Sequence, residues 1–158
     1  MAEGIVIAPA AAGDLQRIIA MDPRVADTPG RREFLDRAHA AGECIVARRV
    51  GELAGFAVFA RSFFEQPFIA LLYTEPAQRR AGVARAIVRH IESLCPGEKL
   101  FTSTNESNAA MHAFCAALGF EHSGRIDNLD EGDPEIVYFK HAAAARAGDA
   151  AATMGAQR

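Results

Sequence analysis

One stretch of the sequence decides the fold: Thr74-Glu75-Pro76-Ala77-Gln78-Arg79-Arg80-Ala81-Gly82-Val83-Ala84. It follows an apolar run, residues 68–73, and a helix-like pattern starts at Gly82. The first N–H groups of a helix lack intrahelical partners and lie at the positive end of its dipole, where phosphate binds. Gly82 and Ala84 leave room for a phosphate, and the arginines add positive charge. The stretch therefore indicates an anion site, with a solvated connection bearing surface arginines as the alternative.

The composition is that of one ordinary globular domain. The chain has 158 residues and a mass of 16.9 kDa, with 50% hydrophobic residues and a mean hydropathy of +0.02. A domain of this size buries roughly two-thirds of its unfolded surface. No apolar run is long enough to span a membrane, and the start lacks the basic and apolar regions of a signal peptide. We therefore expect a cytoplasmic protein with no membrane partner.

Charge and cysteine usage narrow the function further. The formal net charge of -3 argues against a broad basic surface for nucleic acid, but it leaves a local basic pocket open. The three cysteines are an odd number without C-x-x-C spacing, which indicates neither a disulfide framework nor a zinc site. We expect no metal, and we expect most of the three, Cys44, Cys95 and Cys115, to be small core residues.

The chain is expected to alternate strands and helices in the order β-α-α-β-β-β-α-β-α-β-β, which predicts a mixed sheet with helices on both sides. Val50-Gly51 suits the tight turn of a hairpin. Thr28 and Pro29 suit the cap and the first position of the second helix. The expected strands cover residues 5–9, 44–47, 53–60, 68–73, 99–102, 121–126 and 135–140.

The helix that opens at Gly82 is expected to be amphipathic. Its apolar side should hold Val83, Ile87, Ile91 and Leu94. Its polar side should hold Arg85, Arg89 and Glu92. Residues 103–107 are expected to form a loop that leads into the last helix, which begins near Asn108 and is closed by Gly119.

Two motifs make the chain resemble the GNAT superfamily of acyl-CoA-dependent N-acetyltransferases. The first, written Q/R-x-x-G-x-G/A, is matched by Arg79, Gly82 and Ala84. The second is an Asn followed eleven and twelve residues later by Gly-Phe, and it is matched by Asn108 and Gly119-Phe120. The expected order of elements is also similar to that of the family. The resemblance covers about residues 3–140.

The resemblance implies a fold and a domain boundary. The fold class is α/β (α+β), with a GNAT-like mixed, mostly antiparallel sheet of six or seven strands, splayed between strands 4 and 5, and with helices on both faces. Residues 1–140 would form a single acetyltransferase domain. Residues 141–158 are an Ala-rich tail with little periodicity, expected to be frayed or disordered. More narrowly, residues 102–105 and 130–135 are similar to those of a group of small bacterial members with mostly undefined substrates.

The resemblance also implies how acetyl-CoA is bound. Its pyrophosphate would lie on the N–H groups of residues 79–84, where an anion site is already indicated. Its pantetheine arm would pair with the backbone of residues 72–74. Asn108 would hydrogen-bond the pantetheine or its phosphate end, or it is an ordinary helix-start residue. The implied cofactor residues are Leu72, Tyr73, Thr74, Arg79, Arg80, Ala81, Gly82, Val83, Ala84 and Asn108.

The chemistry departs from the family at one position. The customary general acid is a Tyr seven residues after the Asn, and here that residue is Cys115. Cys115 could donate a proton, be activated by His112 one helical turn away, or carry the acetyl group covalently, and His112 could itself be the acid. The alternative is that Cys115 only packs in the core. Glu75 and Glu65 are candidate bases by position, or they are solvent-exposed loop acids.

The best clue to the acceptor is the acidic loop before the last strand. Its carboxylates, at Asp130, Glu131, Asp133 and Glu135, would attract a cationic amine, although the same residue types suit a polar turn. We expect an enzyme that transfers the acetyl group of acetyl-CoA to a primary amine of a small molecule or peptide, by direct attack in a ternary complex. The rival function, prompted by the missing Tyr, is an acyl-CoA-binding sensor or subunit with weak or no catalysis. A homodimer is compatible with the apolar content.

Overall fold

The computed structural model describes residues 4–144. Within this range the chain forms two compact units. The first contains residues 4–61 and 68–90, and the second contains residues 62–67 and 91–144. Residues 145–158, which make up most of the Ala-rich tail, lie outside the described residues. The single domain of residues 1–140 stays a prediction.

The first unit is built on four strands in the order β1-β2-β3-β4. They are β1 (Ile5–Pro9), β2 (Cys44–Arg49), β3 (Glu52–Phe63) and β4 (Gln66–Thr74). β2 is antiparallel to both β1 and β3. Between β2 and β3, Val50 and Gly51 have φ angles of 55° and 78°, the positive values that a two-residue hairpin turn needs. The predicted hairpin is therefore confirmed.

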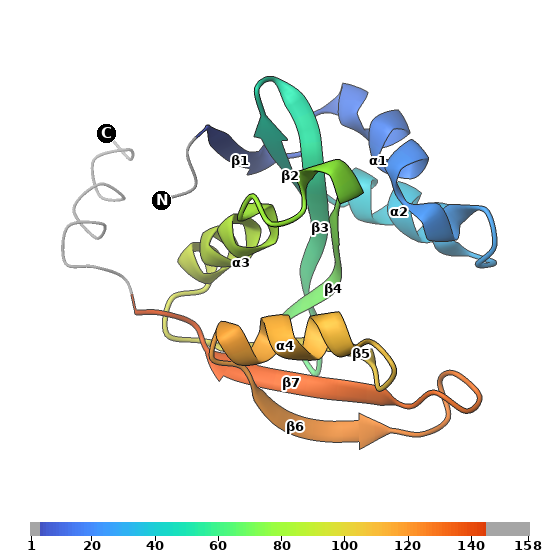
Figure 1. Ribbon diagram of the computed structural model, residues 1–158, viewed down its shortest axis with the longest axis vertical. Helices are drawn as coiled ribbons and strands as arrows, with labels where there is room; N and C mark the ends of the chain where they lie inside the picture. Colours follow the sequence, from blue (N-terminus) through green and yellow to red (C-terminus); the bar gives the residue numbers. More distant parts are fainter. Residues whose placement is uncertain (1–3, 145–158) are drawn as a thin grey trace. The chain divides into compact units, whose positions relative to one another are not determined.

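Helices cover both faces of these strands (Figure 1). On one face, α1 (Leu15–Met21) and α2 (Arg31–Ala40) contribute Ile18 and Leu35 to a buried cluster that contains Phe56 of β3. The helix α3 (Val83–Leu94) begins on the opposite face, because Val83 lies against Gly55 and neighbouring strand residues point to opposite faces. The prediction of helices on both sides is confirmed.

The second unit has three antiparallel strands with a helix over one face (Figure 1). The strands lie in the order β5 (Lys99–Asn105), β7 (Glu135–His141) and β6 (Glu121–Ile126), and the helix is α4 (Ala109–Ala117). β5 runs three residues beyond its predicted end, so residues 103–105, expected in a loop, pair with β7 instead. The predicted α/β class with a mixed, mostly antiparallel arrangement of strands is confirmed.

The start of α2 differs from the prediction. The sequence pattern placed its cap at Thr28 and its first position at Pro29, whereas the helix begins at Arg31 after Gly30. The Thr28 hydroxyl donates to Asp27 Oδ1 at 3.2 Å instead of capping a helix. Gly30 has a φ angle of 82°, a left-handed conformation that glycine adopts at little cost. The chain therefore turns at the glycine, and the prediction was wrong by two residues.

Most of the predicted apolar side of α3 is confirmed, but the prediction is wrong near the end of the helix. The confirmed buried residues are Val83, Ile87 and Ile91. Leu94, predicted inside, is 48% exposed, and Glu92, predicted outside, is 3% exposed. The Glu92 carboxylate accepts from Lys140 Nζ at 2.8 Å and from the Ala143 N–H at 3.2 Å. These partners stabilise a buried charge, and a helical period alone does not reveal them.

The first residues of the Ala-rich segment are packed. β7 extends to His141, and Ala142 is 3% exposed. The Ala142 N–H donates to Glu98 O at 2.8 Å, and its carbonyl accepts from the Gly97 N–H at 3.1 Å. The segment expected to be frayed or disordered therefore begins as part of the second unit.

Gly55 provides a test of the packing in the first unit. An added Cβ would lie 2.6 Å from Tyr73 O and 3.0 Å from Val83 Cγ1. Gly55→Ala should lower the free energy of unfolding by about 1–3 kcal/mol, because the backbone of β4 must shift. Chemical denaturation measures this change. Gly13→Ala is the matched control, since an added Cβ there meets nothing within 4 Å. Equal stability of the two variants would contradict the close approach at Gly55.

Candidate active site

The predicted anion-binding stretch is anchored on the strands of the first unit. After β4, residues 76–78 form a short 3-10 turn that precedes α3. The Glu75 N–H donates to Ala54 O at 2.9 Å, and Arg49 Nη1 donates to Gln78 Oε1 at 3.1 Å. Both partners belong to strands, so the loop is held at two points before it reaches the helix.

The backbone of this loop turns through two left-handed residues before α3. Arg80 and Gly82 have φ angles of 67° and 83° and alternate with residues of negative φ. The N–H groups of Arg79 and Ala81 donate within the loop, to Pro76 O at 3.3 Å and to Gln78 O at 3.4 Å. The Ala86 N–H donates to Gly82 O at 3.0 Å, so the helical N–H groups before it have no intrahelical acceptor. The exposed positive side chains of this region are Arg79, Arg80, Arg85 and Arg89.

The end of β4 carries two polar groups. Thr74 Oγ1 is buried, and within residues 4–144 it has no hydrogen-bond partner. An unpaired buried hydroxyl costs about 1–3 kcal/mol. Burial raises the pKa of Tyr73, and the negative charge of Glu75 raises it further. The Glu75 carboxylate therefore lies close enough to the Tyr73 phenol to act on its charge.

Asn108 is the cap of α4 in the second unit. Its Oδ1 accepts from the Met111 N–H at 3.2 Å, which is the usual role of Asn at a helix start. The side chain is exposed. Capping uses the side-chain oxygen and not the amide nitrogen, so the same side chain is able to cap the helix and to donate to a ligand. The two roles weighed for this residue are therefore compatible.

Cys115 is inaccessible and holds its proton. Its side chain is 0% exposed, and burial raises the pKa of its thiol to about 11. A reactive cysteine has the opposite features, a partly exposed thiol with a lowered pKa. The lowering of this pKa that His112 was expected to cause is not found. Cys44 and Cys95 are also buried, as expected of core residues.

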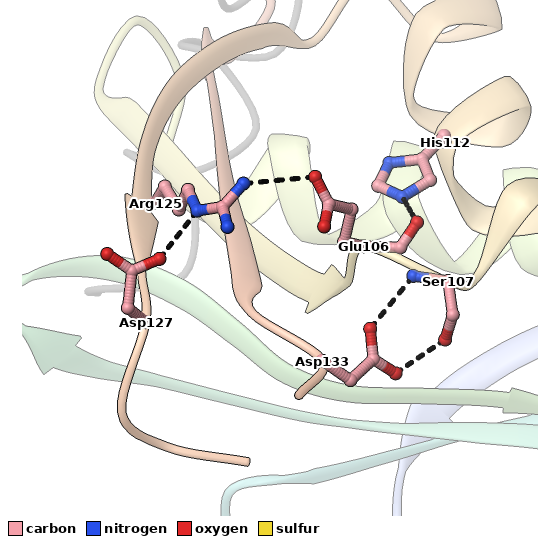
Figure 2. Close-up of polar contacts among 6 residues, drawn as sticks. All are labelled: Glu106, Ser107, His112, Arg125, Asp127 and Asp133. Atoms are coloured by element: carbon pink, nitrogen blue, oxygen red, sulfur yellow. Dashed lines mark hydrogen bonds and ion pairs between the residues drawn. The ribbon is translucent and has the colours of Figure 1, made fainter. Parts of the chain in front are cut away.

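Both ring nitrogens of His112 have partners. Nε2 lies 2.9 Å from Glu106 O (Figure 2), and Nδ1 lies 2.5 Å from the Tyr138 hydroxyl oxygen. A carbonyl only accepts, so Nε2 donates to Glu106 O. His112 therefore joins α4 to β7 and to the segment before the helix, and neither nitrogen is left for Cys115.

Tyr138 is a residue that the sequence reasoning did not single out. It pairs with Thr102 of β5. Burial raises the pKa of its phenol, and the neighbouring Cys115 raises it further. The Tyr138 hydroxyl contacts His112, which lies one helical turn before Cys115. The sequence held a signal for the orientation of Tyr138. Side chains alternate between the two faces of a strand, so Tyr138 lies on the same face as Ile136 and Lys140.

The acidic loop, residues 130–134 between β6 and β7, contacts the segment that joins β5 to α4. Asp130 Oδ2 accepts from Asn105 Nδ2 at 2.8 Å. Asp133 accepts from the N–H and the hydroxyl of Ser107, at 3.0 and 2.5 Å (Figure 2). Glu131 is exposed and takes no part in these bonds. Asp130 and Asp133, two of the four acids expected to attract an amine, are therefore engaged in internal hydrogen bonds.

The predicted site residues fall in both units. Residues 72–84 lie in the first unit, and Asn108, His112, Cys115 and the acidic loop lie in the second. Among the described residues, no group of three or more His, Cys, Asp and Glu side chains could hold a metal ion. Across residues 4–144, no helix has the length and apolar character that a membrane span requires.

Known proteins resemble this one over most of its length. The sequence matches the model of the acetyltransferase (GNAT) family over residues 14–120. A GNAT family acetyltransferase from Bacillus cereus has a TM-score of 0.79 and 33% sequence identity, and the match covers 90% of this chain and 99% of that one. A GNAT family acetyltransferase from Elizabethkingia anophelis, with acetyl-CoA bound, has a TM-score of 0.71 and 18% identity, covering 88% of this chain and 99% of that one.

Two curated relatives match a shorter part of the chain. They are the peptidyl-lysine N-acetyltransferases YjaB of Escherichia coli and Salmonella typhimurium, 36% and 35% identical over 63 residues. The match covers 40% of this chain and 42% of the length of each of these relatives, so this chain spans less than half of their length. The family model matches more than half of the chain, and the Bacillus cereus relative shares 33% of its residues over 90% of it. This protein therefore belongs to the GNAT family of acetyltransferases.

Proposed function

We propose that this protein is an N-acetyltransferase that transfers the acetyl group of acetyl-CoA to a primary amine of a small molecule or peptide, by direct attack in a ternary complex. The observation that carries the proposal is the loop between β4 and α3. There, left-handed residues at Arg80 and Gly82 precede a helix N-terminus, within the region that the family model matches. Backbone N–H groups and arginine side chains together suit a pyrophosphate.

The residues proposed to hold acetyl-CoA fit its chemistry. They are Leu72, Tyr73, Thr74, Arg79, Arg80, Ala81, Gly82, Val83, Ala84 and Asn108. The N–H groups at the start of α3 would bind the pyrophosphate, and the backbone of residues 72–74 would pair with the pantetheine amides. The amide nitrogen of Asn108, which the helix cap does not use, would donate to the same cofactor. When bound, acetyl-CoA supplies the activated thioester.

Glu75 is the residue that we assign to accept the amine proton. It follows the proposed pantetheine edge directly and is half-buried. We assign Cys115 to the core, because its thiol is buried and its raised pKa keeps it protonated. A leaving thiol with a pKa of roughly 8.5, by analogy with cysteine, needs little help from an acid. The absence of the customary Tyr is therefore compatible with catalysis.

A lysine side chain of a peptide is the acceptor to test first. The two curated relatives are named as peptidyl-lysine N-acetyltransferases. The exposed carboxylate of Glu131 would favour a cationic acceptor. The rival function is an acyl-CoA-binding sensor, favoured by the buried Cys115 at the position of the customary Tyr. The cytoplasmic location and the homodimer stay predictions.

A panel of acceptors distinguishes the two functions. The protein is incubated with acetyl-CoA and, in turn, with a lysine peptide blocked at its N-terminus, a lysine-free peptide with a free N-terminus, and a small polyamine. Release of the CoA thiol is followed by a colorimetric reagent, and products are identified by mass. Amine-dependent release is expected with at least one acceptor. Tight CoA binding by calorimetry without such release would favour the sensor.

Gly82→Glu should abolish CoA binding, because it places bulk and negative charge where the pyrophosphate is proposed to lie. Gly51→Glu is the matched control. The two glycines have φ angles of 83° and 78°, so either variant carries a similar backbone strain of about 1–2 kcal/mol, but Gly51 lies in the hairpin turn. Calorimetry with CoA measures both variants. Retention of wild-type affinity in Gly82→Glu would contradict the assigned site.

Glu75→Gln and Cys115→Ala test the proton assignments. Glu75→Gln should lower kcat by about a hundredfold or more, the usual contribution of a general base, while CoA affinity is retained. Cys115→Ala should leave kcat within about threefold of wild type and lower the free energy of unfolding by about 1–2 kcal/mol, through lost packing. Steady-state kinetics and calorimetry with CoA provide the measurements. A hundredfold loss of kcat in Cys115→Ala would contradict its assignment to the core.

A further inference from the structure

The acidic loop holds the last residue of β5 and the two residues that follow it on the way to α4. We call residues 105–107 the connecting segment. Its first two bonds to the loop are Asn105 Nδ2 to Asp130 Oδ2 at 2.8 Å and to Asp133 O at 3.0 Å, and the next is the Glu106 N–H to Pro134 O at 2.7 Å. Ser107 then donates to Asp133, so each residue of the connecting segment donates to the acidic loop.

Asp133 makes the best-defined of these contacts (Figure 2). Its Oδ1 accepts from the Ser107 N–H at 3.0 Å, and its Oδ2 accepts from the Ser107 hydroxyl at 2.5 Å. Hydrogen bonds to a charged acceptor are about twice as strong as neutral ones. The hydroxyl bond, and then the backbone bond, lower the pKa of Asp133. One carboxylate therefore fixes both the backbone and the side chain of Ser107.

Glu106 is held by two further residues of the same unit. Arg125 of β6 donates from Nη1 to Glu106 Oε1 at 3.1 Å and from Nε to Asp127 Oδ1 at 2.5 Å. His112 of α4 donates to Glu106 O at 2.9 Å. Figure 2 shows these contacts around the connecting segment. The backbone that leads into α4 is therefore restrained by β6, by α4 itself and by the acidic loop.

Asn108 follows the connecting segment directly, and it is the residue of this unit that the proposed function assigns to acetyl-CoA. We propose that Asp133 is a positioning residue for cofactor binding: it holds the connecting segment so that the Asn108 side chain is in place for acetyl-CoA. The inference rests on the proposed function and deepens it. A segment that is already ordered loses less conformational entropy when the cofactor binds, and affinity is higher for that reason.

This role differs from attraction of the acceptor amine, the function first considered for these acids. The charge of Asp133 already has two donors from Ser107, and an incoming ammonium would have to compete with them. Positioning depends on the hydrogen bonds that Asp133 makes, whereas attraction depends on its charge. Substitutions that change one property and keep the other therefore separate the two roles.

The test compares three variants of the full chain. Asp133→Ala removes both hydrogen bonds to Ser107. Asp133→Asn removes the charge, but its amide oxygen can still accept from the Ser107 N–H and its amide nitrogen can still donate to the hydroxyl. Glu131→Gln removes one charge from the same loop without touching Ser107. By calorimetry with CoA, Kd should rise about tenfold in Asp133→Ala, stay within about threefold in Asp133→Asn and be unchanged in Glu131→Gln.

Kinetics and a second pair of variants complete the test. In Asp133→Ala, KM for acetyl-CoA should rise with Kd while KM for the amine stays constant. Ser107→Ala, which removes only the hydroxyl bond, should weaken CoA binding about threefold, and Ser107→Thr should restore it. The two Ser107 variants test whether the Ser107–Asp133 hydrogen bond supports CoA binding, even if Asp133→Ala does not fold.

The contrary outcomes separate this inference from the proposed function. Equal CoA affinity in the wild type, Asp133→Ala and Ser107→Ala would overturn the inference alone. Equal losses in Asp133→Ala and Asp133→Asn, confined to KM for the amine, would also overturn it and restore the attraction of an amine. Absence of CoA binding in the unaltered protein would contradict the proposed function and this inference together.

Discussion

The close approach of β4 and α3 to Gly55 is the contact on which the first unit depends. Because residue 55 has no side chain, Tyr73 O and the Val83 side chain both lie against β3. The end of β4 and the first residue of α3 therefore both lie against the same position of β3. The loop between them must then turn sharply, and it does so through left-handed residues at Arg80 and Gly82. The same constraint that packs the sheet thus shapes the proposed site for the pyrophosphate.

Features with local causes could be predicted from the sequence. The hairpin at Val50-Gly51, most of the apolar side of α3 and the loop before it follow from neighbouring residues or from one period. Contacts between distant residues could not. His112 and Tyr138 are 26 residues apart, as are Ser107 and Asp133, and each pair meets only because β7 lies between β5 and β6. Local patterns do not determine that order.

The candidate site shows the same limit in its acidic residues. Asp133 and Glu131 are neighbours of one chemical type, and the sequence indicates the same attraction of an amine for both. In the structure Asp133 is bonded to Ser107, whereas Glu131 is exposed to solvent. Likewise Glu92 was predicted on the polar side of α3, because the helical period does not reveal its ion pair with Lys140 in the interior. For each carboxylate, the partner decides the role, and the partner is remote in sequence.

Lysine is scarce in this chain, which has two, Lys99 and Lys140. The ammonium of Lys140 donates to the Glu92 carboxylate at 2.8 Å and to Leu118 O at 2.7 Å. It also lies over the Phe120 ring, 5.5 Å from the ring centroid. An amine enclosed in this way is shielded from a thioester in solution, whereas Lys99 is exposed. Acetylation of this chain by free acetyl-CoA should therefore occur at Lys99 and spare Lys140, so a modified lysine of the chain has one expected position.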